Sequence, residues 1–189
     1  MGNMSDAVSL TDLIHRAQDG DAAALRSVFD ATYPQLRELA RVRLGGSGRG
    51  TFLNTTSLVH ESYLRFANAG RLSIDDRAHF MRYAGRVMRS IIVDFVRERL
   101  AQRRGGGALH VTLNSQIDAA ATEAESEILR IHDALEQLAQ YDSRMVSIIE
   151  MRYFGGMTEN EVADALDITD RTVRREWEKA RLLLAEALE

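Results

Sequence analysis

The side chains with the clearest chemistry lie near the C-terminus of this 189-residue sequence. They follow the segment "MTENEVADALDIT" and carry guanidinium, hydroxyl and ammonium groups: Arg171, Thr172, Arg174, Arg175 and Lys179. Guanidinium forks suit the edges of guanine bases, while hydroxyl and ammonium groups suit phosphates. Acids are interleaved with them, namely Asp170, Glu176 and Glu178, so a solvated helix with surface ion pairs is the simpler alternative. The cationic cluster and the turn before it together favour a DNA-reading helix.

A second cationic segment, from about His79 to Arg104, has the pattern of a long amphipathic helix. Its polar positions are mostly arginine: Arg82, Arg86, Arg89, Arg97, Arg99, Arg103 and Arg104. Arginine among aromatic and apolar residues suits a single nucleic-acid strand, which is followed through its phosphates and stacked bases. Acids on this segment are few, Asp94 and Glu98, so a merely solvated arginine face is the weaker interpretation.

A third stretch, "FLNTTSLVHESYLRF" from Phe52 to Phe66, carries three successive hydroxyls at the start of an expected amphipathic helix. They belong to Thr55, Thr56 and Ser57, and a phosphate on any of them would add negative charge at a helix N-terminus. Taken as residues alone, these hydroxyls are more simply explained as helix N-caps.

Helices are the elements expected to position these groups, because the chain has one Pro and alternating β-branched residues are almost absent. Ser9 can cap a first helix that Gly20 ends, and Asp21 starts the next. Pro34 is expected at the first turn of a third helix, where its missing N–H is tolerated.

Two further helices are expected on either side of the turn "DIT". Thr158 and Glu161 form a capping box for the first, and Thr169 caps the second. Val173 and Trp177 can complete a small core beneath the second helix. This pattern predicts a helix-turn-helix.

The sequence thus predicts an all-α protein with two small helical domains. The first covers residues 1–104 and the second residues 125–189. Between them, residues 105–124 lack helical periodicity and are rich in Gly, Ala and Ser, which indicates a flexible linker. Such a linker permits many arrangements of the two domains, including a closed one.

Composition argues against several classes of protein. Without Cys there is neither a disulfide framework nor a thiolate metal site, and no apolar run approaches the roughly 20 residues of a membrane helix. His60–Glu61 lacks the second His of a zinc-protease helix, and the other histidines are scattered. We therefore expect no metal, cofactor or catalysis, and a cytoplasmic protein that is monomeric when free. The net charge of −4 argues against non-specific coating of nucleic acid.

Two blocks of the sequence are similar to one known family. The C-terminal block, from "LEQLAQYDSRMVSIIEMRYF" through "MTENEVADALDITDRTVRREWEKAR", resembles the promoter-binding domain of extracytoplasmic-function (ECF) sigma factors. The segments "YPQLRELARVRL", "LVHESYLRF" and "FMRYAGRVMRSIIVDFVRERLAQRR" resemble the N-terminal domain of that family. The resemblance implies a subunit that binds RNA polymerase core and directs transcription initiation at promoter DNA.

The resemblance also implies a division of labour between the two cationic helices. The C-terminal helix would recognise the upstream, minus-thirty-five promoter element. The long basic helix would contact and help open the downstream, minus-ten element through these residues: Phe80, Arg82, Tyr83, Arg86, Arg89, Ser90 and Arg97. Phe80 and Tyr83 are candidates for stacking on unpaired bases, although a core role suits Phe80 at least as well. Related sequences commonly have Asn at the position of Ser90, so the downstream specificity of this chain is open.

Family members usually carry acidic residues just before the segment "LVHESYLRF", where they engage a basic surface on the clamp coiled coil of the largest polymerase subunit. Here the matching positions hold Asn54, Thr55, Thr56 and Ser57, followed by Leu58 and Glu61. The chain is similar to a subgroup that lacks the acidic patch and is thought to be controlled by Ser/Thr kinases. A phosphate on Thr56, or next on Thr55 or Ser57, would restore the missing charge.

A different class of protein also accounts for the C-terminal motif. A transcription regulator that binds DNA by itself would use the same helix-turn-helix, and it would bind its promoter without polymerase. A sigma factor with this acidic net charge would bind DNA weakly or not at all when free.

Overall fold

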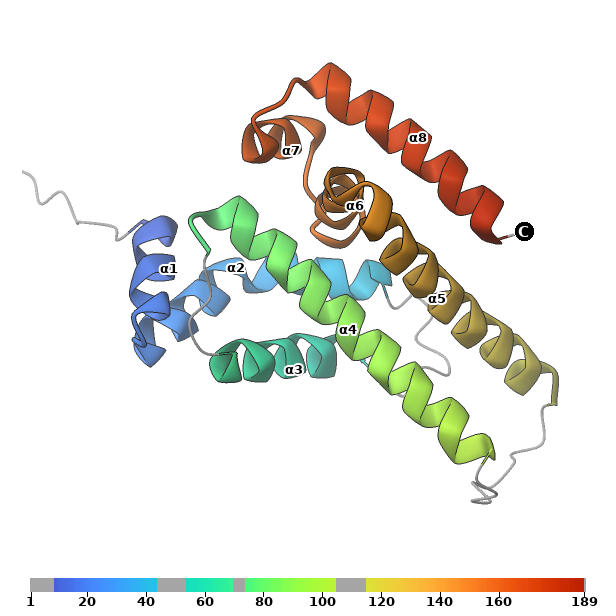
Figure 1. The fold of residues 1–189 in the computed structure, drawn as a ribbon. Coiled ribbons are helices and arrows are strands. Elements are labelled where there is room, and N and C mark those ends of the chain that lie inside the picture. Colours follow the sequence, from blue (N-terminus) through green and yellow to red (C-terminus); the bar gives the residue numbers. More distant parts are fainter. Residues whose placement is uncertain (1–8, 44–53, 70–73, 105–114, 189) are drawn as a thin grey trace, which may run out of the picture.

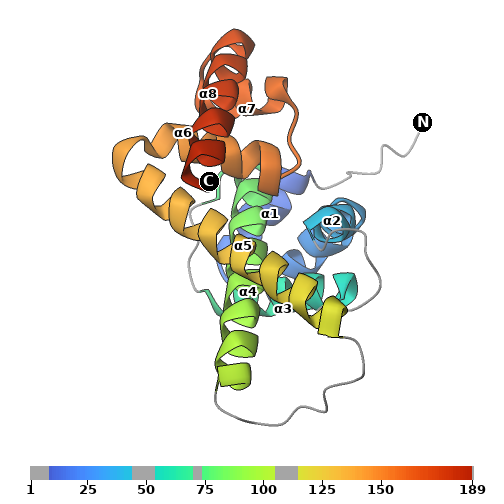
Figure 2. The same ribbon diagram turned by 90° about the vertical axis from the view of Figure 1, so that its right-hand side faces the viewer.

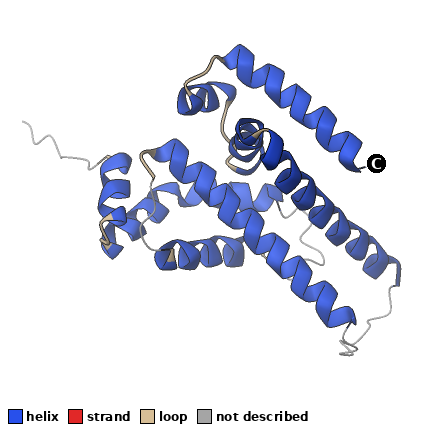
Figure 3. Cartoon of the chain, viewed as in Figure 1, coloured by secondary structure: helices blue, strands red, loops and turns tan. Residues whose placement is uncertain are grey.

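The computed structural model describes residues 9–43, 54–69, 74–104 and 115–188, and within these ranges every regular element is a helix (Figures 1 and 3). In chain order they are α1 (Leu10–Gln18), α2 (Ala22–Arg43), α3 (Thr55–Asn68), α4 (Arg77–Arg104), α5 (Ser115–Tyr141), α6 (Ser143–Ile149), the π-helix η1 (Glu150–Phe154), α7 (Glu159–Leu166) and α8 (Asp170–Leu188). The predicted all-α class is confirmed. The glycine-rich break at 45–50 and residues 105–114 of the predicted linker lie outside the described residues.

Capping residues set the helix starts where the sequence predicts them. At α1 the amide of Asp12 donates to Oγ of Ser9 at 3.1 Å, and the Asp12 carboxylate accepts from the Ser9 amide. At α7 the amide of Glu161 donates to Oγ1 of Thr158 at 3.3 Å, while the Thr158 amide donates to the Glu161 carboxylate at 2.8 Å. Both capping boxes satisfy backbone donors that a helix N-terminus leaves free.

Two predicted boundaries are wrong. Pro34 lies inside α2 rather than at the start of a new helix. Buried residues on both sides of it, Val28 and Leu36, pack into the same core, so the hydrogen bond that Pro34 removes does not end the helix. In addition, α5 begins at Ser115, ten residues before the expected start of the second domain at residue 125. The alanines there favour helix, and Arg103 of α4 donates to Thr122 of α5 at 2.8 Å.

Helix α4 separates two packed groups of helices (Figures 1 and 2). On one side α1, α2 and α3 form a core with α4 that includes Leu36, Leu58 and Phe80. On the other side α5 to α8 have their own apolar clusters, centred on Leu135, Ile148 and nearby side chains. Helix α4 also lies against α5, η1 and α7, so the two groups of helices touch along it.

Loss of the α7 capping box should destabilise the C-terminal helices measurably. The pKa of Glu161 lies below its ordinary value of 4.5, chiefly because its carboxylate accepts a hydrogen bond from the Thr158 amide. Hydrogen bonds from the Thr158 hydroxyl and from Arg77 lower this pKa further. A lowered pKa in the folded state means that the stabilisation is present above pH 4.5 and is lost as the pH falls through the lowered value. Glu161→Ala should therefore reduce the unfolding free energy by about 1 kcal/mol near neutral pH, and by less in acid.

Urea denaturation followed by circular dichroism at neutral and acidic pH would measure this difference. Asp164→Ala removes another acid from α7, one with an exposed side chain, and should change stability by less than about 0.5 kcal/mol. Equal losses for the two variants would contradict the role of the capping box.

Candidate nucleic-acid interface

The N-terminal half of α8 presents its cationic side chains to solvent. Thr169 caps the helix, because the amide of Thr172 donates to its hydroxyl at 3.2 Å, and Val173 is fully buried beneath. Arg171 and Arg175 are four residues apart and therefore share the face opposite Val173. Both are exposed, with three-quarters of the Arg175 side chain accessible. This face could enter a groove of DNA without any change in the protein.

Arg174 is held differently from its neighbours. Its Nη2 and Nε atoms donate to Glu159 of α7 at 2.9 and 3.2 Å. This hydrogen bonding raises the pKa of Arg174 above its already high ordinary value. Asp167, in the turn between the two helices, adopts a left-handed conformation with φ of 52°. The hydrogen bonds from Arg174 to Glu159 therefore link α7 to α8 across this turn. Lys179, one helical turn after Arg175, is exposed.

The arginines of α4 converge on a single buried carboxylate. Glu150 of η1 is 3% exposed, and its oxygens lie 3.7 Å from Nε of Arg82, 3.3 Å from Nε of Arg86 and 3.3 Å from Nη2 of Arg89. Nη2 of Arg89 also lies 3.2 Å from Glu136 of α5. Burial raises the pKa of the Glu150 carboxyl above its ordinary value, although the three guanidinium groups act in the opposite direction. The interpretation of α4 from its own acids missed these partners, because they lie on other elements.

Further along α4 the same pairing continues with α5. Arg97 lies 4.0 Å from Asp133, and Arg99 and Arg103 lie 3.1 and 2.8 Å from Glu125. A row of carboxylates from the C-terminal helices therefore runs along the arginine face of α4.

Two hollows border α4. One of about 430 Å³ lies between α2, the first turns of α4 and residues 155–157, and the other has a volume of about 620 Å³. The larger one lies between α3, α4 and α5, and four of the predicted residues line it: Tyr83, Arg86, Arg89 and Ser90. The sequence did not indicate Arg65 of α3, which donates to Ser90 at 3.0 Å and to Asp94 at 2.8 Å. No helical spacing links α3 to α4, so this contact could be found only from the tertiary structure.

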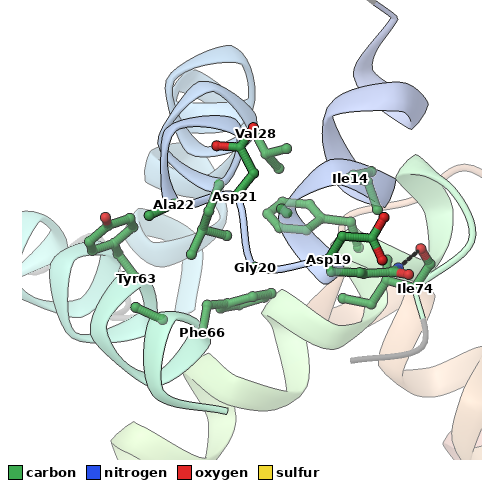
Figure 4. A pocket seen from close by; sticks show the side chains of 14 residues that line it. Ile14, Asp19, Gly20, Asp21, Ala22, Val28, Tyr63, Phe66 and Ile74 are labelled. Carbon is green, nitrogen blue, oxygen red and sulfur yellow. Dashed lines mark hydrogen bonds between the residues drawn. The ribbon is translucent and has the colours of Figure 1, made fainter. Parts of the chain in front are cut away.

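Two predicted contact residues belong to the core instead. Phe80 is 2% exposed and packs edge-on against Phe29 at 5.7 Å, so it cannot stack on a base in this conformation. It also forms part of the wall of a mostly apolar hollow of about 360 Å³ between α1, α2 and α3, where Tyr63 and Phe66 lie on the α3 side (Figure 4). Leu58 is fully buried and cannot face a partner. Tyr83 remains half-buried.

At the start of α3 the N-cap is Asn54, not one of the hydroxyl residues. Its side-chain oxygen accepts from the Ser57 amide at 2.8 Å, and Thr55, Thr56 and Ser57 form the first turn of the helix. Thr56 and Ser57 are exposed and Thr55 is half-buried. Because Asn54 is the N-cap, the explanation of the three hydroxyls as N-caps is wrong. The first turn contains no acid.

The described residues contain no cluster of three or more His, Cys, Asp or Glu side chains that could hold a metal ion. Among the described helices, none has the length and apolar character needed to span a membrane.

Comparison with known proteins identifies a family. A family model described as "ECF sigma factor" matches residues 7–189, which is nearly the whole chain. No curated protein matches the chain.

Proposed function

The chain belongs to the ECF sigma factor family, and from this premise we propose how its helices divide promoter recognition and polymerase binding. As a member of this family it is a non-catalytic factor for transcription initiation whose partners are RNA polymerase core and promoter DNA. In our proposal residues 1–104 form the domain that binds core and the minus-ten element. Residues 125–189, together with the earlier turns of α5 from Ser115, form the domain that binds the minus-thirty-five element.

The observation that carries the proposal is the exposed cationic face at the start of α8. Arg171 and Arg175 lie on the side of the helix opposite its core, and Thr169 caps the helix just before them. Guanidinium groups near the N-terminus of a second helix are suited to base edges in the major groove. We propose α7 and α8 as a helix-turn-helix that binds the upstream element.

We assign the downstream element to α4 and the hollow beside it. Tyr83, Arg86, Arg89 and Ser90 offer a ring edge, two guanidinium groups and a hydroxyl within one hollow. Such a combination suits an unpaired strand, which is held through phosphates and stacked bases. Phe80 and Leu58 are left out of the proposed contacts because both are buried.

We assign polymerase docking to the first turn of α3. Asn54 already satisfies one backbone donor there, which leaves the hydroxyls of Thr55, Thr56 and Ser57 without a capping duty. A phosphate on Thr56 would stand at a helix N-terminus, where the dipole favours anions, and would supply the charge that family members usually carry in carboxylates. A Ser/Thr kinase is therefore the regulatory partner we propose. Glu61 adds one carboxylate, which lies 4.0 Å from Arg65.

Transcription with purified core polymerase tests the function itself. Core supplemented with this protein, phosphorylated where required, should start transcripts at defined positions on genomic DNA, with shared sequence elements upstream of the start sites. Protection of these elements in footprints should require core, because the acidic free chain gains little from counterion release. Specific protection by the protein alone would instead support a regulator that acts without polymerase.

A further inference from the structure

A buried carboxylate lies on the helix that we assign to the upstream element. Glu176 of α8 comes three residues after Val173 and four before Ala180, and all three residues are buried, so they share the core face of the helix. Only 8% of the Glu176 side chain is accessible. A buried carboxylate is costly unless its oxygens are paired, so the partners of Glu176 are important for the charges around it.

Arg144 of α6 is the main partner of this carboxylate. Its Nη2 atom donates to Oε1 of Glu176 at 2.7 Å and its Nε atom donates to Oε2 at 3.3 Å, so one guanidinium group engages both oxygens. Arg144 is the second residue of α6, and Asp142 caps that helix by accepting from the Met145 amide at 2.9 Å. The guanidinium group is therefore held by a capped helix that packs against α8 (Figure 1).

Arg175, to which we assign a base of the upstream element, lies next to the same carboxylate. Its Nη2 atom is 3.5 Å from Oε1 of Glu176, which is a looser contact than the 2.7 Å hydrogen bond from Arg144. The Arg175 side chain is 74% accessible, whereas that of Glu176 is almost enclosed. Because Arg144 already engages both oxygens, most of the donors of Arg175 stay available to a base edge.

The same geometry indicates what would follow from the loss of Arg144. Among the described residues, Arg175 would then be the remaining ion-pair partner of Glu176. A guanidinium group that pairs fully with a carboxylate cannot present the same fork of donors to a guanine edge. Loss of Arg144 would therefore draw Arg175 toward Glu176 and away from the DNA.

We infer that Arg144 is a positioning residue for upstream recognition: it pairs with Glu176 and thereby leaves the guanidinium group of Arg175 free to read a base. This inference rests on the proposed role of Arg175 in binding the minus-thirty-five element. It assigns a function in promoter specificity to two residues outside the exposed face of α8, and neither of them has to touch a base.

The first test is Arg144→Ala, alone and combined with Glu176→Gln. The protein is assayed with core polymerase, phosphorylated where required, on promoters in which each upstream base is varied. Arg144→Ala should lower discrimination at least about fivefold at the base where Arg175→Ala loses it. Addition of Glu176→Gln should restore wild-type discrimination to within about twofold, because the neutral amide does not form an ion pair with Arg175.

Glu176→Gln alone is the second variant, since it removes the ion pair without leaving an unpaired buried charge. It should keep discrimination within about twofold of wild type, although the link between α6 and α8 is weakened. Arg130→Ala, at an exposed position on α5, makes the same change in net charge as Arg144→Ala and should leave discrimination unchanged. Thermal melts followed by circular dichroism check that each variant is folded at the assay temperature.

A double-mutant cycle separates positioning from direct contact with DNA. In a chain that carries Arg175→Ala, Arg144→Ala should change discrimination at that base by less than about twofold, because no guanidinium group is left there to pair with Glu176. An equal loss at every upstream base, with the salt dependence reduced by about 1, would instead make Arg144 a phosphate contact and would overturn the inference.

Rescue of Arg144→Ala by Glu176→Gln, together with the missing effect in the Arg175→Ala chain, would support the inference. Unchanged discrimination in Arg144→Ala would overturn it. A loss of discrimination that Glu176→Gln does not rescue would also overturn it, because the ion pair would then act only as a structural link between α6 and α8. Failure of the proposed function would appear separately, as absence of start sites with the wild-type protein and core polymerase.

Discussion

Phosphorylation of Thr56 is expected to tighten binding to RNA polymerase core by about tenfold to several thousandfold. A phosphate adds about −1.5 to −2 charge and three strong acceptors. One to three charge-assisted hydrogen bonds at about 1.5–1.7 kcal/mol each, near the lower end of their usual strength, give this range. The first turn of α3 is suited to the change, because Thr56 is exposed there and no acid is present. Added salt should reduce the gain, since part of it is an attraction between exposed charges. Titration of labelled protein with core at low and physiological salt measures both effects.

Matched variants test whether the effect on core binding depends on where the added negative charge is placed. Thr56→Ala should abolish the response to the kinase, or reduce it to the part contributed by Thr55. Thr56→Glu should recover only part of the gain, because a carboxylate has less charge and fewer acceptors than a phosphate. Ser27→Glu places the same charge on an exposed position of α2 and should leave core binding unchanged. Tight binding of the unmodified protein to core polymerase, with no change on phosphorylation, would contradict the proposal that phosphorylation of Thr56 controls this binding.

The helix ends of this protein are predictable because their signals are local. Ser9, Thr158 and Thr169 each cap a helix through atoms within three residues, so spacing alone identifies them. The exposed face of α8 follows from the same arithmetic, since Arg171 and Arg175 must lie together once Val173 faces the core. Local rules failed at Pro34, where packing on both sides outweighs one missing hydrogen bond.

The environment of the α4 arginines could not be predicted in this way. The acids on the same helix are only Asp94 and Glu98. The carboxylates that accept from Arg89 belong to Glu136 and Glu150, which lie 47 and 61 residues further along the chain. A face of arginines therefore looks available in the sequence and is paired in the folded chain. The burial of Phe80 and Leu58 has a different origin, because helix periodicity, which is a local signal, points both side chains towards the core.

Replacement of Arg171 or Arg175 by Ala is expected to reduce transcription from cognate promoters by about 5- to 150-fold. Each exposed guanidinium can form a bidentate pair with a guanine edge, and such a pair is worth about 1–3 kcal/mol of discrimination. The loss should depend on the base at one upstream position, so a promoter library with each base varied in turn would identify the base that each arginine recognises. Start-site counts for each promoter supply the measurement.

Variants of Lys179 and Arg174 are the controls for the base-dependent loss expected of the Arg171 and Arg175 variants. Lys179→Ala should weaken binding to all promoters to the same extent and reduce the salt dependence by about 1, as expected of a phosphate contact. Arg174→Ala removes the hydrogen bonds to Glu159, so it should loosen α7 against α8 and lower thermal stability as well as activity. Arg171→Ala touches no such link and should leave the melting temperature unchanged. Arg175 lies 3.5 Å from the buried carboxylate of Glu176 and makes no contact with α7, so Arg175→Ala should lower the melting temperature less than Arg174→Ala does. A uniform loss at every promoter base for Arg171→Ala and Arg175→Ala would reassign their guanidinium groups to the DNA backbone.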